Sequence, residues 1–175
     1  MNFTLTVPVG PADHVVGPSG ARVTLVEYGD LECPNCKQAA PVVTLLLRKF
    51  PDQLRFAFRH FPLEGVHPNA VLAAEAAECA GGQGKFWQMH DLLFENQQHL
   101  QRDHLVAYAT SLQLDMARFT SELDDHVYLQ RVREHLASGN ESGVRATPAF
   151  FIDGRIQDVS FGLNHLVEAV KARVG

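Results

Sequence analysis

The sequence has little that would place the chain in a membrane or on nucleic acid. No apolar run approaches the length that a helix needs to cross a bilayer, so we expect no membrane span. The formal net charge is -5 and no stripe of Lys and Arg is present, which argues against a nucleic-acid partner, because affinity for phosphates depends on clustered basic side chains. The 175 residues, 46% of them hydrophobic and 20% charged, predict one globular unit with a sizeable core.

Cysteine is also scarce, and no export signal is visible. The chain has three cysteines, and residues 1–30 contain neither a positively charged start nor a continuous apolar segment. An odd, small number of cysteines without an export signal fits a reducing compartment better than an exterior one. We therefore expect a cytoplasmic protein, or a periplasmic one if a signal peptide has been removed.

Residue patterns predict an α/β fold with a βαβ–ββα core. β-Branched and aromatic residues at 23–28 and alternation at 54–61 indicate two strands, and the aliphatic segment 37–50 between them indicates a helix. Later in the chain, 149–152 and 155–159 form a predicted hairpin around Asp153-Gly154, followed by a last helix over 163–174.

Between these two halves, the pattern indicates four or five short helices. The Ala-rich and Leu-rich segments lie at 70–80, 84–95, 103–112, 115–123 and 128–137. We therefore predict an irregular arm at 1–20, a core domain made of 21–67 and 139–175, and an inserted helical subdomain at 68–138.

The residues that carry chemistry are Cys33-Pro34-Asn35-Cys36, at the predicted start of the first helix. Unpaired amide groups and the positive end of the helix dipole stabilise a thiolate there and lower the pKa of the first cysteine. Cys33 is therefore the predicted nucleophile and Cys36 the predicted resolving thiol. Pro34 suits the first helical turn, where its missing N–H costs nothing. Half of a zinc site is the alternative, but a closed site needs four ligands and no second cysteine pair exists.

Glu27 and Thr147-Pro148 are two further candidate site residues. Glu27 stands six residues before Cys33 in an otherwise apolar strand, where burial would raise its pKa above the ordinary value of about 4.3 and let it carry the proton of Cys36. The alternative is a glutamate that faces solvent. Thr147-Pro148 directly precedes a predicted strand, and a cis bond would explain a proline at that place.

Other residues have a structural interpretation. Cys79 lies among alanines and is predicted to be a core residue. Aromatic and aliphatic residues at 86–94 indicate a packed helix face rather than a substrate surface. Pro41 is expected to kink the first helix. Arg59 and His60 end the second strand, where either could tune Glu27.

Several segments together resemble the DsbA-like branch of the thioredoxin superfamily. The resemblance covers nearly the whole chain beyond the arm and rests on residues 23–36, 58–63, 67–68, 83–91 and 143–152. It implies a thioredoxin-like fold with a helical insertion, and it draws attention to His60 and His90.

The resemblance also implies roles for individual residues. In the family, the first cysteine attacks, the second resolves, the strand acid assists, and a cis-proline loop binds substrate backbone. These roles fall on Cys33, Cys36, Glu27 and Thr147-Pro148, and we place Pro34 and Asn35 with the substrate-binding residues.

We therefore expect a thiol-disulfide oxidoreductase that acts on protein or peptide thiols and disulfides without a cofactor, together with a redox recycling partner that the sequence does not identify. The alternatives are a glutathione-dependent transferase or isomerase on a related fold, and a non-enzymatic redox-sensing or metal-binding module. Asn35 replaces the histidine of the best-known periplasmic oxidant, and Asp30 and Glu32 add two acids near Cys33. These features predict an intermediate potential of about -170 to -250 mV, typical of a reductase or isomerase.

Overall fold

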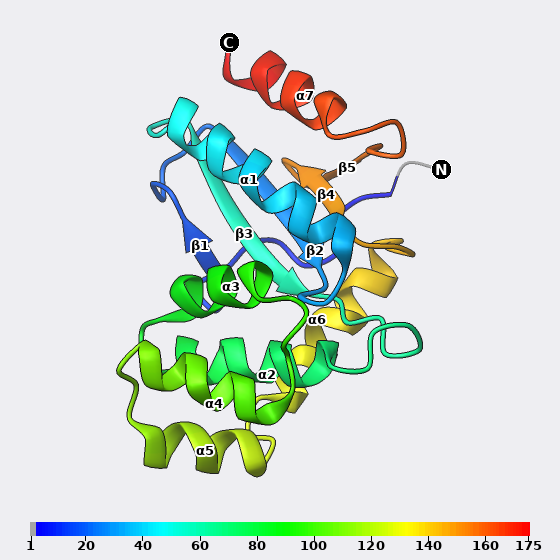
Figure 1. The fold of residues 1–175 in the computed structure, drawn as a ribbon. Coiled ribbons are helices and arrows are strands. Elements are labelled where there is room, and N and C mark those ends of the chain that lie inside the picture. Colours follow the sequence, from blue (N-terminus) through cyan, green and yellow to red (C-terminus); the bar gives the residue numbers. More distant parts are fainter. Residues whose placement is uncertain (1–2) are drawn as a thin grey trace. The chain divides into compact units, whose positions relative to one another are not determined.

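The structure is a computed structural model, and it describes residues 3–175 (Figure 1). The chain divides into two units. Unit 1 contains the N-terminal residues up to Gly29, then Gln38–Arg59 and Ala137–Gly175, and unit 2 contains Asp30–Lys37 and His60–Leu136. The first two residues of the predicted N-terminal arm lie outside the described residues. The predicted limits of the inserted subdomain stay a prediction.

Unit 1 is built on a five-stranded sheet with the order β1-β3-β2-β4-β5. The strands are β1 (His14–Val16), β2 (Val23–Gly29), β3 (Leu54–His60), β4 (Ala149–Ile152) and β5 (Arg155–Gln157). β2 pairs antiparallel with β4, so that Glu27 lies opposite Phe150. The predicted hairpin between β4 and β5 is confirmed. Its turn residues Asp153 and Gly154 have φ values of 48° and 79°, the left-handed conformation that a tight hairpin turn requires.

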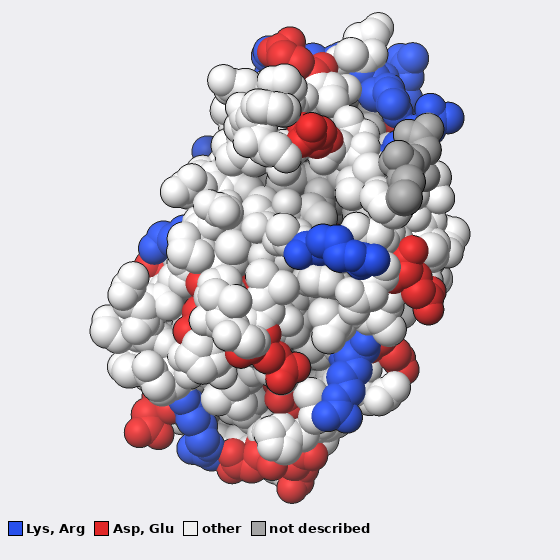
Figure 2. Space-filling model, turned by 90° about the vertical axis from the view of Figure 1, so that its right-hand side faces the viewer, with Lys and Arg blue, Asp and Glu red and all other residues white. Residues whose placement is uncertain are grey.

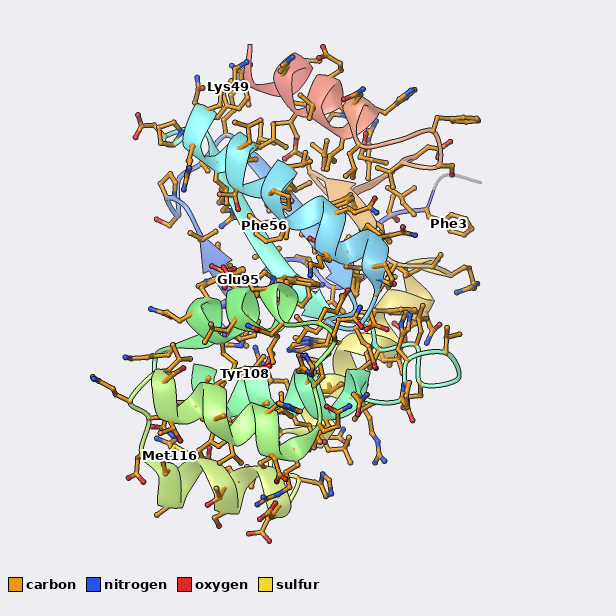
Figure 3. All side chains as sticks on the ribbon, viewed as in Figure 1. Phe3, Lys49, Phe56, Glu95, Tyr108 and Met116 are labelled. Atoms are coloured by element: carbon orange, nitrogen blue, oxygen red, sulfur yellow. The ribbon has the colours of Figure 1, made fainter. Side chains whose placement is uncertain are left out.

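Two helices complete unit 1. Helix α1 (Pro34–Lys49) begins in unit 2 and continues from Gln38 onward in unit 1. Its buried residues Ala39, Val43 and Leu46 recur every three or four positions, which is the spacing of one apolar helix face. Helix α7 (Asn164–Val174) packs against β2 and β4. Phe56 of β3, labelled in Figure 3, is buried in this core.

Unit 2 is helical. It contains α2 (Ala70–Gly81), α3 (Phe86–Glu95), α4 (Arg102–Ser111), α5 (Met116–Asp124) and the first part of α6 (Leu129–Glu141), as the sequence predicts; Figure 3 labels Tyr108 on α4 and Met116 on α5. Helix α2 contacts α3, α4 and α5. It is buried on nearly every side, which its many alanines permit because small side chains allow neighbouring helices to approach. None of the helices formed by the described residues has the length and apolar character of a membrane span.

Strand β1 is absent from the sequence-based prediction, which assigns an irregular arm to residues 1–20. β1 has only three residues and pairs antiparallel with β3, which follows it by about forty positions, so no local periodicity reveals it. The N-terminal segment is nonetheless held firmly. The Arg59 guanidinium donates to both carboxylate oxygens of Asp13 at 2.8 and 2.9 Å and to the carbonyls of Val7 and Pro8.

The same guanidinium donates to the Tyr28 hydroxyl at 3.0 Å. All five of its N–H groups are then engaged, so Arg59 has no donor left for Glu27. The prediction that Arg59 tunes Glu27 stays a prediction, and it would act through the charge of the guanidinium rather than through a hydrogen bond. The side chain is buried because it joins the N-terminal segment to the sheet.

The end of β2 generates a stability prediction. A Cβ added to Gly29 would overlap the ring of Phe58, which is fully buried in β3. We expect Gly29→Ala to lower the free energy of unfolding by about 1–3 kcal/mol, as overpacked cores do, in urea denaturation. Gly20→Ala is the matched control, because its Cβ would meet no atom within 4 Å. Equal unfolding midpoints for the two variants would contradict the prediction.

Candidate active site

The two cysteines of the motif lie at the start of α1, as predicted. The Cys33 carbonyl accepts the Lys37 N–H at 3.1 Å, the first bond of the helix, which makes Cys33 the N-cap residue. Cys33 is 5% exposed and Cys36 is 0% exposed, while Pro34 and Asn35 between them are exposed. The first sulfur thus belongs to the residue at the helix terminus, where the dipole favours a thiolate.

A buried carboxylate, that of Asp30, organises the approach to this helix. Its Oδ1 accepts the Glu32 N–H at 2.7 Å, and its Oδ2 accepts the Leu63 N–H and the Nδ1–H of His67, both at 2.8 Å. The Asp30 backbone N–H points to the Cys36 sulfur at 3.4 Å. One residue therefore connects the turn, the segment after β3 and the second cysteine.

Two other side chains hold the same turn. The Glu32 carboxylate accepts the backbone N–H of Asn69 at 2.6 Å and its side-chain amide at 2.8 Å. Gln97, which follows α3, donates its amide to the carbonyls of Leu31 and Cys33 at 3.0 and 2.9 Å. Neither Asn69 nor Gln97 is predicted from the sequence, and no local signal marks them, because they reach the motif only in the folded chain.

His67 was named only as part of the resemblance, and the structure gives it a specific environment. Burial by itself would lower its pKa, but the hydrogen bond to Asp30 and the negative charges of Asp30, Cys33 and Glu32 outweigh burial, and the pKa of His67 is raised. The side chain is 15% exposed. The imidazole is therefore favoured as a cation beside the cysteine turn.

The other predicted site residues belong to unit 1. Glu27 is 2% exposed, so the alternative of a solvent-facing glutamate is wrong. The Thr147–Pro148 bond is cis, as predicted. Pro148 lines a hollow of ≈ 380 Å³ between the loop at 143–149 and the residues of and after β5. Because the cysteines belong to unit 2, the roles of Glu27 and Pro148 toward the two sulfurs stay predictions.

Cys79 is a core residue, as predicted. It is fully buried in α2. Burial, and then the nearby carboxylates of Glu122, Glu75 and Glu78, raise the pKa of Cys79 to about 12. The predicted packed face of α3 is also confirmed, since Phe86, Met89, His90, Leu93 and Phe94 are buried.

Among the described residues, one cluster has the ligand types and spacing for a metal ion: His60, Glu78 and His135. It does not include the motif cysteines. The carboxylate of Glu78 lies 2.9 Å from Nε2 of His60 and 2.8 Å from the Arg131 guanidinium. Because this guanidinium already supplies a positive charge, we assign the cluster a structural role.

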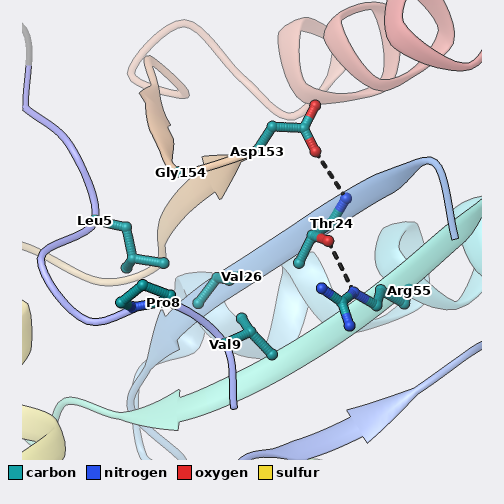
Figure 4. A pocket seen from close by; sticks show the side chains of 8 residues that line it. All are labelled: Leu5, Pro8, Val9, Thr24, Val26, Arg55, Asp153 and Gly154. Atoms are coloured by element: carbon teal, nitrogen blue, oxygen red, sulfur yellow. Dashed lines mark hydrogen bonds between the residues drawn. The ribbon is translucent and has the colours of Figure 1, made fainter. Parts of the chain in front are cut away.

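Two surface features do not point to another site. The cavity in Figure 4, in unit 1, has a volume of ≈ 330 Å³, and its polar groups bond to one another: Thr24 N–H donates to Asp153 and Arg55 donates to the Thr24 hydroxyl. On the face shown in Figure 2, Lys and Arg side chains are interspersed with acidic and uncharged surface rather than gathered in a stripe.

Comparison with known families decides the classification. A family model described as Thioredoxin matches residues 10–172, nearly the whole chain. The chain belongs to the thioredoxin family. The sheet of unit 1, the cysteine pair at the start of α1 and the cis-proline loop are thus parts of a thioredoxin-like fold.

Solved structures of DsbA-like proteins have the same fold as this thioredoxin-family chain. It superposes on oxidised BdbD from Bacillus subtilis with a TM-score of 0.86 at 22% identity, covering 99% of each chain. DsbA2 from Pseudomonas aeruginosa gives a TM-score of 0.72 at 26% identity, covering 94% of this chain and 96% of that one. The fold expected from the sequence is therefore confirmed.

A curated relative is much longer. The Na(+)/H(+) antiporter NhaA 1 of Salinispora arenicola is 48% identical over 167 residues, which are 95% of this chain and 26% of that protein. The chain thus spans about a quarter of the length of this relative. The antiporter name describes the longer protein and carries no activity to this chain.

The environment of Cys79 generates a reactivity prediction. With a pKa of about 12, about one Cys79 side chain in ten thousand is a thiolate at pH 8, and only the thiolate is alkylated. We expect iodoacetamide to label Cys33 in the folded, reduced protein and to label Cys79 only after denaturation, as mass spectrometry of the peptides would detect. Labelling of Cys79 at a rate comparable to Cys33 before unfolding would contradict this account.

Proposed function

We propose that the chain is a thiol-disulfide oxidoreductase that acts on protein or peptide disulfides through Cys33. The observation that carries the proposal is the Cys33–Cys36 pair, with Cys33 as the N-cap of α1 in a thioredoxin-family chain. Thiol-disulfide exchange needs a thiolate that can attack and a second thiol within reach, and a cysteine pair at a helix start supplies both. No cofactor takes part.

The proposed reaction has two displacement steps. The Cys33 thiolate attacks one sulfur of a substrate disulfide; a Cys33–substrate bond forms and the other substrate sulfur leaves as a thiolate. The Cys36 thiolate then attacks the Cys33 sulfur, and the second substrate sulfur leaves. The substrate gains two electrons, and the Cys33–Cys36 pair loses two and becomes a disulfide.

Other residues have supporting roles in this proposal. Glu27 takes the proton from Cys36 before the second step, and its burial in β2 is consistent with this role because the carboxyl is shielded from bulk water. Pro34, Asn35, Thr147 and Pro148 bind the substrate chain, a role consistent with the exposure of Pro34 and Asn35 and with the hollow beside Pro148.

The compartment is also part of the proposal. The comparisons give no support to the cytoplasmic location expected from the cysteine count, and they are compatible with the periplasmic alternative. We therefore assign the exchange reaction without tying it to a reducing compartment. Whether the chain works as a reductase or isomerase is set by the redox potential of its cysteine pair.

The rival activities differ in their need for Cys36. A glutathione transferase or isomerase activates glutathione with one residue, so it would retain activity in Cys36→Ser. A redox-sensing or metal-binding module would not turn over substrate. The Asp30 N–H held 3.4 Å from the Cys36 sulfur favours exchange, because a backbone donor at the sulfur stabilises a thiolate on the second cysteine.

A trapping experiment tests the proposal. With Cys36→Ala, the mixed disulfide on Cys33 cannot be resolved, so we expect covalent complexes with a disulfide-bonded protein substrate to accumulate at least tenfold on non-reducing gels. Cys33→Ala should form none. Cys79→Ala is the matched control and should behave like the unchanged protein. Equal trapping by the Cys36 and Cys33 variants would reject the assignment of the nucleophile, and the absence of trapping in both would reject the exchange reaction.

A further inference from the structure

The sequence of the turn that carries the two cysteines, residues 30–36, suggests a weakly stabilised thiolate on Cys33. Asn35 supplies only a neutral amide between the two cysteines, and Asp30 and Glu32 precede Cys33. Two negative charges near a thiolate would oppose its formation. The structure changes this interpretation, because both acids are engaged by partners within unit 2.

The partner that matters most is His67. Its Nδ1–H donates to Asp30 Oδ2 at 2.8 Å, and the same carboxylate oxygen accepts the Leu63 N–H at 2.8 Å. Asp30 in turn accepts the Cys33 N–H at its backbone carbonyl, at 3.0 Å. The imidazole is thereby anchored to the turn that carries Cys33.

The position of His67 determines which charged groups surround its imidazole. The titratable groups that act on His67 are Asp30, Cys33 and Glu32, all of them negative when ionised. Glu32 is also held in place, by the backbone and side-chain amides of Asn69. A protonated His67 therefore compensates the negative charge of Asp30. Because an electrostatic coupling between two groups is reciprocal, the Cys33 thiolate stabilises the His67 cation and the His67 cation stabilises the thiolate.

We infer that His67 is the cationic residue that stabilises the Cys33 thiolate and so sets the redox potential of the Cys33–Cys36 pair. It is a positioning and electrostatic residue rather than a nucleophile, and it supplies from the segment after β3 the positive charge that Asn35 does not supply inside the motif. This inference rests on the proposed function, because it concerns the potential of the same dithiol.

The direction in which His67 shifts the redox potential follows from the exchange equilibrium with glutathione. The protein disulfide and two glutathione molecules give the protein dithiol and one glutathione disulfide, so two electrons pass to the protein. When Cys33 is a thiolate, the reduced protein releases one proton and carries a negative charge beside His67. A protonated His67 stabilises this reduced form and makes the disulfide more oxidising.

The pH dependence follows as well. The raised pKa of His67 keeps the imidazole protonated at the ordinary histidine pKa, and the charge is lost as the pH rises through the raised value. The effect of His67 on the potential should therefore be larger at pH 6.5 than at pH 9.

Replacement of His67 by glutamine tests the inference, because a glutamine amide can still donate to Asp30 but carries no charge. At pH 6.5 we expect His67→Gln to lower the equilibrium constant with glutathione about threefold to tenfold, a shift of about 15–30 mV to more negative potential. The ultraviolet absorbance of the Cys33 thiolate should appear at higher pH in this variant. His67→Lys, which restores the charge, should recover the potential at pH 6.5. His165→Gln, at an exposed position of α7, is the matched control.

The outcomes separate the inference from the proposed function. A shift in His67→Gln at pH 6.5 that is smaller at pH 9, with His165→Gln unchanged, supports the inference. An unchanged potential in His67→Gln, or an equal shift at both pH values, overturns it and leaves the proposed function intact, because the unchanged protein still exchanges with glutathione. Failure of the unchanged protein to exchange at all overturns the proposed function and the inference with it.

Discussion

The conformation of the turn at residues 30–36, which carries the two cysteines, depends on the buried carboxylate of Asp30. Placing a charged group in the interior costs several kcal/mol unless hydrogen bonds and an opposite charge compensate it. Here the compensation comes from the Glu32 and Leu63 amides and from His67. Glu32 belongs to the turn itself, and Leu63 and His67 belong to the segment after β3, so satisfying one carboxylate ties the path of the chain into α1 to that segment.

This constraint connects the fold to the proposed chemistry. A thiolate at a helix start needs a helix that begins at a defined residue, and the Cys33 N–H bonded to Asp30 together with the Lys37 N–H bonded to Cys33 defines that beginning. Gln97 satisfies the Leu31 and Cys33 carbonyls. The backbone around the proposed nucleophile thus has its hydrogen bonds met within unit 2, while the sulfur belongs to the N-cap residue of α1.

The sequence predicted what short-range patterns encode. Alternation and helical spacing located β2, β3, α1 and the β4–β5 hairpin within a few residues, and the cysteine spacing identified the candidate dithiol. It could not predict β1, whose three residues are ordered by pairing with β3, or the partners of Asp30 and Glu32, which come from distant segments. Asp30 and Glu32 were therefore interpreted as acids that oppose the thiolate, although in the folded chain hydrogen bonds and His67 compensate them.

The most direct test of this account is the unfolding of Asp30→Asn in the reduced state, measured in urea at pH 5.5 and pH 8.5. Asparagine has the same shape but one acceptor oxygen, so at least one buried amide loses its partner, and we predict a loss of about 2–3 kcal/mol of unfolding free energy at pH 8.5. Because the pKa of His67 is raised in the folded protein, its ion pair with Asp30 contributes fully below the ordinary histidine pKa and is lost as the pH rises through the raised value. The loss should therefore be larger at pH 5.5. A variant within about 0.5 kcal/mol of the unchanged protein at both pH values, the range of an ordinary surface substitution, would contradict the account.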